Sequence, residues 1–363
     1  MSSHRRSTLR RLRAGVIASV LVLGGIVGGL AGSGGAPPAL AAPGIGGAGR
    51  SVSGWLPWWT IDASTADAVA HADALSIASP FWYELQGPRR VAGFSGAGSA
   101  KVLSSLRGTG ALVYPTVVES MSASRIVRLF ESPTKRRRAI ARLANLAAAH
   151  GYDGLDLDFE RMAATDTAKR AARVAADYVA FAQRLATRLH ADGRGLSVTV
   201  MARTADTTWH AGMSATVYDY AGLGAAADVL RVMAYDRHWS GGKPGAIAPL
   251  PWVRAILAYT TPLVPASKVE LGVPTYGYDW PDGAHGSAVT YRGARALQHE
   301  HDATVVWNHT SAESHFDYRA KGAVHHVWFA DARSIKLRAQ VAANAGLRGI
   351  VLWTLGGEPK SVW

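Results

Sequence analysis

The sequence of 363 residues contains no cysteine. That absence excludes a disulfide framework and a thiolate site, so stability must come from a packed core. Charged residues are few, at 18%, against 48% hydrophobic residues, which excludes a disordered chain and supplies material for a sizeable core. No internal repeat is visible. No glycine-rich phosphate loop follows the first predicted strand, which argues against an open, doubly wound sheet.

The first 41 residues have the pattern of an export signal. Five arginines precede an apolar run that ends at about Leu30, and Ala39-Leu40-Ala41 follows as an A-x-A cleavage pattern. We expect a signal peptide over residues 1–41, a flexible linker over 42–52 and one folded domain over 53–363. The apolar run is just long enough to span a bilayer, so an uncleaved membrane anchor is the alternative. Both interpretations place the folded part outside the cytoplasm, secreted or associated with the cell wall.

The chain is basic, with a net charge of +13. Five of these charges belong to the N-terminal arginines, so the remainder carries +8. Such an exported protein is expected to stay near anionic polymers such as a cell wall. A nucleic-acid partner is not expected, because the sequence shows no basic helix interleaved with aromatic residues and no nucleic-acid-binding motif.

Apolar segments typical of strands alternate with segments of helical spacing. One helix is expected to begin after Ser132, with Pro133 at its first position, and to end at Gly151. Strands alternating with helices predict a parallel sheet, and eight units favour a closed (β/α)8 barrel, the TIM-barrel class of α/β folds. The expected strands are 53–58, 74–82, 111–118, 154–159, 196–202, 229–235, 269–276 and 349–354.

The alternation breaks after the seventh expected strand. Residues from about 280 to 330 contain only short strand-like pieces, which predicts a small α+β insertion at that point of the barrel.

An acidic segment, Asp153-Gly-Leu-Asp-Leu-Asp-Phe-Glu160, carries the strongest functional signal. Side chains alternate faces along a strand, so Asp156, Asp158 and Glu160 share one face and the apolar residues share the other. Carboxylates that point into a barrel are costly without partners or a task. Crowding raises the pKa of at least one of them, as a general acid requires. Glu160, last on the strand, is expected at the C-terminal mouth, where barrel active sites lie.

The less specific interpretations are a solvated acidic edge or a divalent-metal site. A metal would require these carboxylates to converge with histidine or further oxygen ligands. The nearest histidine, His150, precedes the strand and is expected at a helix end, so catalysis is favoured over a metal site.

The acidic segment resembles the D-G-x-D-x-D-x-E signature of glycoside hydrolase family 18, the chitinase family. Met233-Ala-Tyr-Asp236 resembles the M-x-Y-D motif of that family, and Gly349–Trp353 resembles its last strand, which ends in the tryptophan beneath the sugar. The resemblance covers about residues 53 to 358 and implies a catalytic barrel. The insertion after strand seven is similar to one that many members carry.

Strand three lacks the Ser-x-Gly-Gly pattern that is common in the family. This departure, with Gly54–Trp59 and Ser79–Tyr83, gives the chain a closer resemblance to the bacterial branch of spore-cortex and cell-wall hydrolases. It weakens the case for crystalline chitin as the substrate.

The resemblance implies a retaining, substrate-assisted hydrolysis of β-1,4 linkages next to N-acetylglucosamine. Glu160 would be the proton donor, and Asp158 would hold the acetamido N–H and stabilise the oxazolinium. Asp156 would share a proton with Asp158, and Tyr235 would donate its hydroxyl to the acetamido carbonyl.

Further residues are candidates for contact with the sugar. Asp236 would contact the sugar or pair with a basic residue such as Arg203. Tyr276 ends strand seven and could line the cleft, while Trp58 and Tyr83 end strands one and two and could stack on sugar rings. The complete substrate-binding set is Trp353, Met233, Asp236, Trp58, Tyr83, Tyr276 and Arg203.

Two questions stay open from the sequence. Peptidoglycan, chitin and N-glycans all contain the required sugar, so a polysaccharide containing N-acetylglucosamine is the expected partner. A lectin-like barrel with weak or no catalysis is the alternative function, although the presence of Glu160 and Tyr235 argues against it. The protein is expected to be a monomer.

Overall fold

The computed structural model describes residue 45 and residues 51–164, 168–206, 209–210 and 213–363. The predicted signal peptide and nearly all of the predicted linker lie outside the described residues. Among the helices that the structure describes, none has the length and apolar character needed to cross a membrane.

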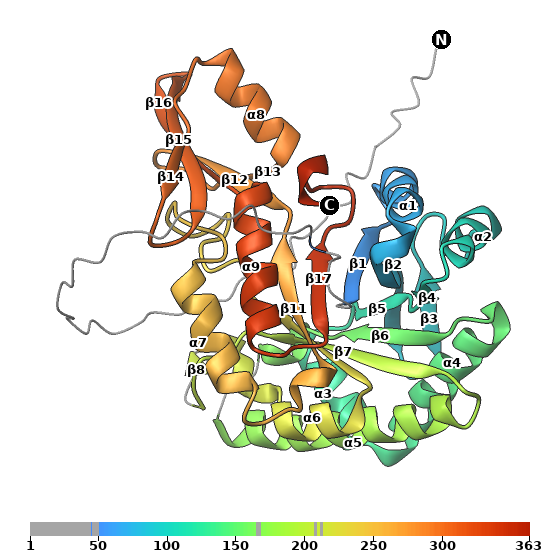
Figure 1. Cartoon of the computed structure of the whole chain (residues 1–363). Helices are drawn as coiled ribbons and strands as arrows, with labels where there is room; N and C mark the ends of the chain where they lie inside the picture. The colour runs from blue at the N-terminus through green and yellow to red at the C-terminus, as the bar shows by residue number, and fades with distance from the viewer. Residues whose placement is uncertain (1–44, 46–50, 165–167, 207–208, 211–212) are drawn as a thin grey trace, which may run out of the picture.

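Eight parallel strand positions form a closed barrel (Figure 1). The first strand pairs with both the second and the last, which closes the sheet. The (β/α)8 prediction is therefore confirmed. In chain order the barrel strands are β1 (Ser51–Pro57), β2 (Leu75–Gly87), β4 (Leu112–Val113) with β5 (Thr116–Glu119), β6 (Gly154–Asp158), β7 (Gly195–Met201), β10 (Val229–Met233), β11 (Val269–Pro274) and β17 (Gly349–Trp353).

The third strand position is divided into β4 and β5 around Tyr114 and Pro115. Proline has no N–H to donate to a neighbouring strand, so the ladder is interrupted there. The carbonyl oxygen of Pro115 still accepts the N–H of Asp156 at 3.1 Å, which keeps β5 in register with the acidic strand.

Helices surround the barrel, and their ends follow local signals in the sequence. The side chain of Ser132 accepts the N–H of Lys135, and Gly151 ends the same helix in the left-handed conformation at φ 62°. The outer helices are α1 (Ile61–Ala70), α2 (Ala100–Gly108), α3 (Ala123–Glu131), α4 (Pro133–His150), α5 (Ala168–His190), α6 (Tyr220–Ala226), α7 (Leu250–Thr260) and α9 (Ala332–Asn344).

The insertion after β11 is a five-stranded antiparallel sheet with one helix, at the upper left of Figure 1. It begins at Tyr276, a few residues before the expected boundary, and it has a small core of its own around Phe316 and Phe329. Its elements are β12 (Tyr276–Pro281), β13 (Ser287–Thr290), α8 (Tyr291–Glu300), β14 (Val306–Asn308), β15 (Glu313–Ala320) and β16 (Ala323–Phe329).

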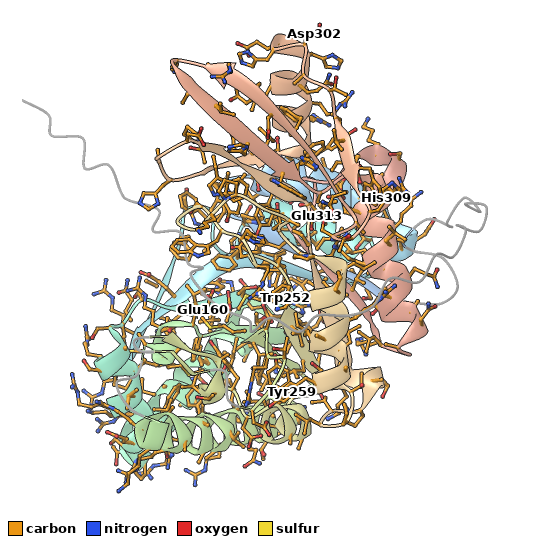
Figure 2. All side chains as sticks on the ribbon, turned by 90° about the vertical axis from the view of Figure 1, so that its left-hand side faces the viewer. Glu160, Trp252, Tyr259, Asp302, His309 and Glu313 are labelled. Carbon is orange, nitrogen blue, oxygen red and sulfur yellow. The ribbon has the colours of Figure 1, made fainter. Side chains whose placement is uncertain are left out.

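A buried carboxylate fixes the insertion to the barrel. Glu313 on β15 accepts the N–H groups of Ile247 and Ala248 at 2.7 Å each and pairs with Arg338 of α9 at 2.8 Å. Figure 2 shows Glu313 at the base of the insertion, where these elements meet. Because the two backbone donors lie on the loop between β10 and α7, Glu313 holds that loop against the insertion.

The ring of Tyr114 packs against Ile77 and Val229 at the N-terminal ends of the barrel strands, a region that we call the floor of the barrel. Two barrel strands pass this ring at glycines, and a Cβ atom at Gly195 would lie 1.9 Å from the Tyr114 hydroxyl oxygen. We therefore expect Gly195→Ala to destabilise the fold by about 1–3 kcal/mol through overpacking, measured by urea unfolding. Gly108→Ala is the matched control, because a Cβ atom there meets nothing within 4 Å. Equal effects of the two substitutions would contradict this account of the floor.

Candidate active site

The three acids of the sequence motif line the inner face of the barrel. Asp156 and Asp158 lie on β6 and Glu160 follows directly after it, while Leu155, Leu157 and Phe159 belong to the outer core. The acids are 0%, 6% and 8% exposed, respectively. Glu160 lies on the side of the barrel that faces the insertion (Figure 2). The alternation of side chains along the strand thus places all three carboxyl groups inside the barrel, where they are almost completely buried.

Asp156 lies deepest and is surrounded by donors. One of its oxygens accepts the Trp55 indole N–H at 2.9 Å and the Thr116 hydroxyl at 2.8 Å. The other accepts the hydroxyl groups of Ser197 at 2.6 Å and Thr199 at 3.2 Å. The guanidinium of Arg231 lies 3.3 Å away, itself paired with the buried Glu270. This carboxylate therefore has partners at every lone pair, as a buried charge requires.

Asp158 and Glu160 have far fewer partners than Asp156. One carboxyl oxygen of Asp158 is buried without a hydrogen-bond partner among the described residues. Burial raises the pKa of both groups well above the usual range. The nearby negative charge of Asp156 raises the pKa of Asp158 further, and that of Asp158 raises the pKa of Glu160 further. A protonated carboxyl group at neutral pH is what a general acid requires.

A fourth carboxyl group, which the sequence analysis missed, lies beneath Glu160. Glu119 is the last residue of β5 and is 2% exposed. It accepts the backbone N–H of Glu160 at 3.1 Å and that of Arg161. Burial raises the pKa of Glu119 to about 8. Its place at the end of an apolar strand beside the acidic one was the signal that could have identified it.

Tyrosines surround the acids from the side of the insertion. Tyr235 follows β10, and its ring lies 6.3 Å from that of Tyr276 on β12. Its hydroxyl has no hydrogen-bond partner among the described residues, so it is free to donate to a ligand. Asp236, in the left-handed conformation at φ 60°, accepts the hydroxyl groups of Tyr276 and Tyr278. Burial raises the pKa of Asp236 to about 6.

A group of aromatic rings packed against Tyr235 forms a further wall of the site. Trp353, at the end of β17, contacts the rings of Trp55 at 5.7 Å and Phe81 at 5.4 Å. Trp59 lies 6.5 Å from Trp353 and is 55% exposed, so it has an open face that can stack on a sugar. Trp58 stacks on Phe94 at 5.9 Å, which places it in the same aromatic group.

Tyr83 does not lie in this group, which corrects the expectation from the sequence. Its hydroxyl bonds that of Tyr152 at 2.6 Å, and its ring packs beside His150 in the outer core. The pairing of β2 with β5 shifts register between Phe81 and Tyr83. The extra residue of this bulge turns Trp82 and Tyr83 together toward the helices, so Phe81 is the residue that faces the mouth.

Arg203 is also placed differently from the expectation. Its guanidinium donates to the carbonyl oxygen of Tyr218 at 2.9 Å and lies over the ring of Tyr259 at 5.0 Å. Asp236 is bound by tyrosine hydroxyl groups instead. Arg203 therefore supports the loop after β7 and does not pair with Asp236. Met233, the last residue of β10, is partly buried against the core.

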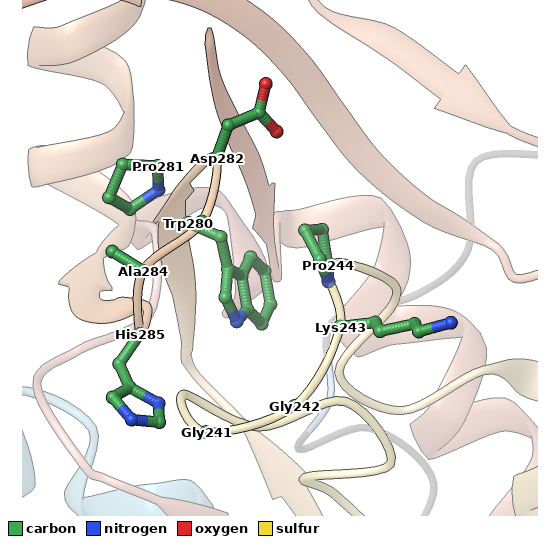
Figure 3. A pocket seen from close by; sticks show the side chains of 10 residues that line it. Gly241, Gly242, Lys243, Pro244, Trp280, Pro281, Asp282, Ala284 and His285 are labelled. Atoms are coloured by element: carbon green, nitrogen blue, oxygen red, sulfur yellow. The ribbon is translucent and has the colours of Figure 1, made fainter. Parts of the chain in front are cut away.

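A cavity of about 330 Å³ lies between the loop after β10 and the turn after β12 (Figure 3). The Trp280 indole stands between the two loops, with His285 at one end. Ring contacts connect Trp280 to Tyr278 at 5.2 Å and Tyr278 to Tyr276 at 5.5 Å. An aromatic row thus runs from Tyr235 to this cavity.

The part of the chain that the structure describes contains no group of three or more histidine, cysteine or carboxylate side chains arranged to hold a metal ion. His325 and His326 of the insertion pair with carboxylates of the same sheet, Asp279 and Asp317 respectively.

The chain belongs to the glycosyl hydrolases family 18, whose model matches residues 113–358. It is 30% identical over 241 residues to the cortical fragment-lytic enzyme of Bacillus subtilis, a match that covers 65% of this chain and 54% of that protein. The chain thus spans about half the length of that relative. The resemblance to the spore-cortex branch is confirmed.

Solved structures agree with this assignment. A chitinase from Chromobacterium violaceum superposes with a TM-score of 0.77 and 27% identity, covering 86% of this chain and 96% of that one. The spore cortex-lytic enzyme SleL of Bacillus cereus has the same fold, with a TM-score of 0.75 and 23% identity over 85% of this chain and 71% of that one.

The raised pKa of Glu160 predicts a gain in stability when its charge is removed. In the unfolded chain a glutamate has a pKa of about 4.3, so above that pH the folded protein binds more protons and its free energy of unfolding falls as pH rises. We expect Glu160→Gln to match the unsubstituted protein near pH 4 and to exceed its melting temperature near pH 8. The control is Glu300→Gln, an exposed carboxylate on α8. A difference that does not grow with pH would contradict the burial of this charge.

Glu119 is predicted to position Glu160. In Glu119→Gln one carboxylate oxygen becomes an amide N–H₂, which cannot accept a backbone N–H. We expect kcat on a soluble oligomer of N-acetylglucosamine to fall at least about tenfold with little change in KM, since a small displacement of the acid is enough. Because the charge of Glu119 raises the pKa of Glu160, the alkaline limb of the pH–rate profile should move to lower pH. A lower melting temperature with an unchanged profile would show a purely structural role.

Proposed function

We propose that the chain is a retaining glycoside hydrolase that cleaves β-1,4 linkages next to N-acetylglucosamine in peptidoglycan- or chitin-type polymers. The observation that carries the proposal is the position of Glu160. Glu160 is a nearly buried acid at the mouth of the barrel, and its pKa is raised. Asp158, two residues earlier, is a second acid whose pKa is raised. Membership of a glycosyl hydrolase family supports the same reaction class.

The first step breaks the glycosidic bond. Ordinary retaining glycosidases use a second carboxylate as nucleophile, whereas substrate-assisted members of this family use the acetamido group of the sugar. The acetamido carbonyl oxygen attacks C1 while Glu160 gives its proton to the leaving oxygen. Asp158, as a carboxylate, accepts a hydrogen bond from the acetamido N–H, and its negative charge balances the oxazolinium. The free hydroxyl of Tyr235 donates to the acetamido oxygen.

The second step restores the enzyme. A water molecule adds to C1, its proton goes to Glu160, and the bond between C1 and the acetamido oxygen breaks. Two displacements at C1 retain its configuration. Asp156 is held in place by its hydrogen bonds and by Arg231. It shares a proton with Asp158, so the proton that Asp158 gives up on becoming the charged partner of the oxazolinium passes to Asp156 and returns in the second step. No cofactor takes part in this scheme.

The aromatic wall gives the sugar its binding surface. Trp353 lies at the centre of this wall, and the exposed face of Trp59 is open for a neighbouring sugar. The cavity beside Trp280 extends the same side of the molecule and favours an extended polymer over a single sugar. A lectin-like barrel is the alternative function, and the complete set of Glu160, Asp158 and Tyr235 disfavours it.

We further propose that the protein acts outside the cytoplasm as a monomer. The basic N-terminal segment, the apolar run and the Ala39-Leu40-Ala41 pattern support export. The name of the Bacillus relative, a cortical fragment-lytic enzyme, favours fragments of cell-wall polymer as the substrate.

Glu160→Gln should lower the rate of hydrolysis by at least about 10²–10⁴-fold while leaving oligosaccharide binding intact, because it removes the acid and keeps the shape of the site. Products from peptidoglycan, chitin oligomers and a high-mannose glycoprotein would be identified by mass spectrometry. A thiazoline analogue of the oxazolinium should inhibit, since it mimics the intermediate.

The control substrate is plain β-1,4-glucan, which lacks the acetamido nucleophile and should not be cleaved. Cleavage of glucan that depends on Glu160 would refute substrate assistance. Binding of chitin oligomers without hydrolysis by the unsubstituted protein would favour the lectin-like alternative.

A further inference from the structure

The positive charge of this protein is concentrated on three neighbouring helices. Helices α3, α4 and α5 contain twelve lysine and arginine residues and two acids, Glu131 and Asp177. Outside these helices and the five N-terminal arginines, the chain has 22 basic and 24 acidic residues. The excess of positive charge on the barrel therefore belongs to one region and is not spread over the surface.

Ten of the twelve side chains are exposed. Lys135, Arg138 and Arg142 follow each other at helical spacing on the outer side of α4, and Lys169 and Arg173 do the same on α5. The basic face, as we name this set, consists of Arg125, Arg128, Lys135, Arg137, Arg138, Arg142, Lys169, Arg173, Arg184 and Arg188.

Few of these charges have an acidic partner in the part of the chain that the structure describes. Asp177 is already bound to Arg136 at 2.6 Å, and within the described residues only Arg188 of the basic face has an ion pair, with Asp192 at 2.8 Å. Clustered like charges repel one another and destabilise a compact state. An array of this kind is stabilised when an anionic partner occupies it.

The basic face begins at the mouth of the barrel. Helix α3 packs against residues 161–163, which follow Glu160, and its Phe130 stacks at 6.3 Å on Phe159, which precedes Glu160. Arg125 of the same helix donates to the carbonyl oxygen of Gln86 at the end of β2. Helices α4 and α5 then run along the barrel, away from the insertion (Figure 1). Side chains with nitrogen tips project outward from this region in Figure 2. A polysaccharide that leaves the active site on this side would pass along the basic face.

We propose that the basic face binds an anionic polysaccharide of the cell envelope, one that carries repeated phosphate or carboxylate groups and is joined to or mixed with the substrate. This inference rests on the proposed function, since it places the polymer beside the cleft. Guanidinium groups bind both kinds of anion through paired hydrogen bonds. Nucleic acid is disfavoured because the exposed positions of these helices carry no phenylalanine, tyrosine or tryptophan to stack on bases.

The test compares two triple variants that remove equal charge. Lys135→Gln, Arg138→Gln and Arg142→Gln neutralise the outer side of α4. Arg292→Gln, Arg319→Gln and Lys321→Gln neutralise three exposed side chains of the insertion and serve as the control. Binding to polygalacturonate, long-chain polyphosphate, neutral dextran and double-stranded DNA is measured over a series of salt concentrations, with all proteins also carrying Glu160→Gln so that no cleavage occurs.

We expect the α4 variant to bind one or both anionic polymers about tenfold or more weakly at low salt, with a shallower salt dependence, and the control variant to bind within about twofold of the parent. The polymer that binds identifies the anion as carboxylate or phosphate. Equal losses in both variants, absence of salt-dependent binding by the parent, or binding to DNA alone would overturn the proposal.

A separate assay distinguishes this inference from the proposed function. With Glu160 restored, both triple variants should hydrolyse short neutral oligomers of N-acetylglucosamine at the parent rate and melt at the parent temperature. If the parent does not hydrolyse the oligomers, the proposed function fails while the binding result stands. If the α4 variant loses this activity or its fold, the face has a structural role and the proposal is wrong.

Discussion

The burial of negative charge inside the barrel is the constraint on which the rest of this structure depends. Asp156 is fully buried, and it is stable there because four side-chain hydrogen bonds and the guanidinium of Arg231 converge on it. These donors come from β5 and β7, the strands beside β6, and from β1 and β10. One carboxylate therefore ties together half of the barrel and fixes the register of β6, which carries the other two acids.

The next two acids on that strand receive no comparable support. Asp158 and Glu160 lie close to each other and to Glu119, and burial disfavours the charged form of each. The group as a whole therefore retains protons at a pH where isolated carboxyl groups have lost them. These buried acids can hold and release a proton near neutral pH, but burying them lowers the free energy of unfolding. Such a cost is common where function requires buried charge.

The insertion completes the site from the opposite side. Its first strand brings Tyr276 and Tyr278 to Asp236, and Glu313 with Arg338 fixes the loop that follows Asp236. The acids of β6 and the tyrosines around Asp236 are therefore held by separate buried networks, one around Asp156 and one around Glu313. The outer helices need not contribute to the chemistry, which leaves α3, α4 and α5 free to carry an excess of basic residues.

Alternation, helical spacing and caps such as Ser132 are local properties of the sequence. They are enough to predict the barrel, the face of β6 on which the acids lie, the insertion and several helix ends. Only the tertiary structure brought Glu119 beneath Glu160, since nothing local relates the end of β5 to the end of β6. It also decided that Phe81 and not Tyr83 faces the mouth, because a bulge shifts the alternation. The partners of Arg203 and the clustering of basic side chains likewise depend on which helices and loops become neighbours in space.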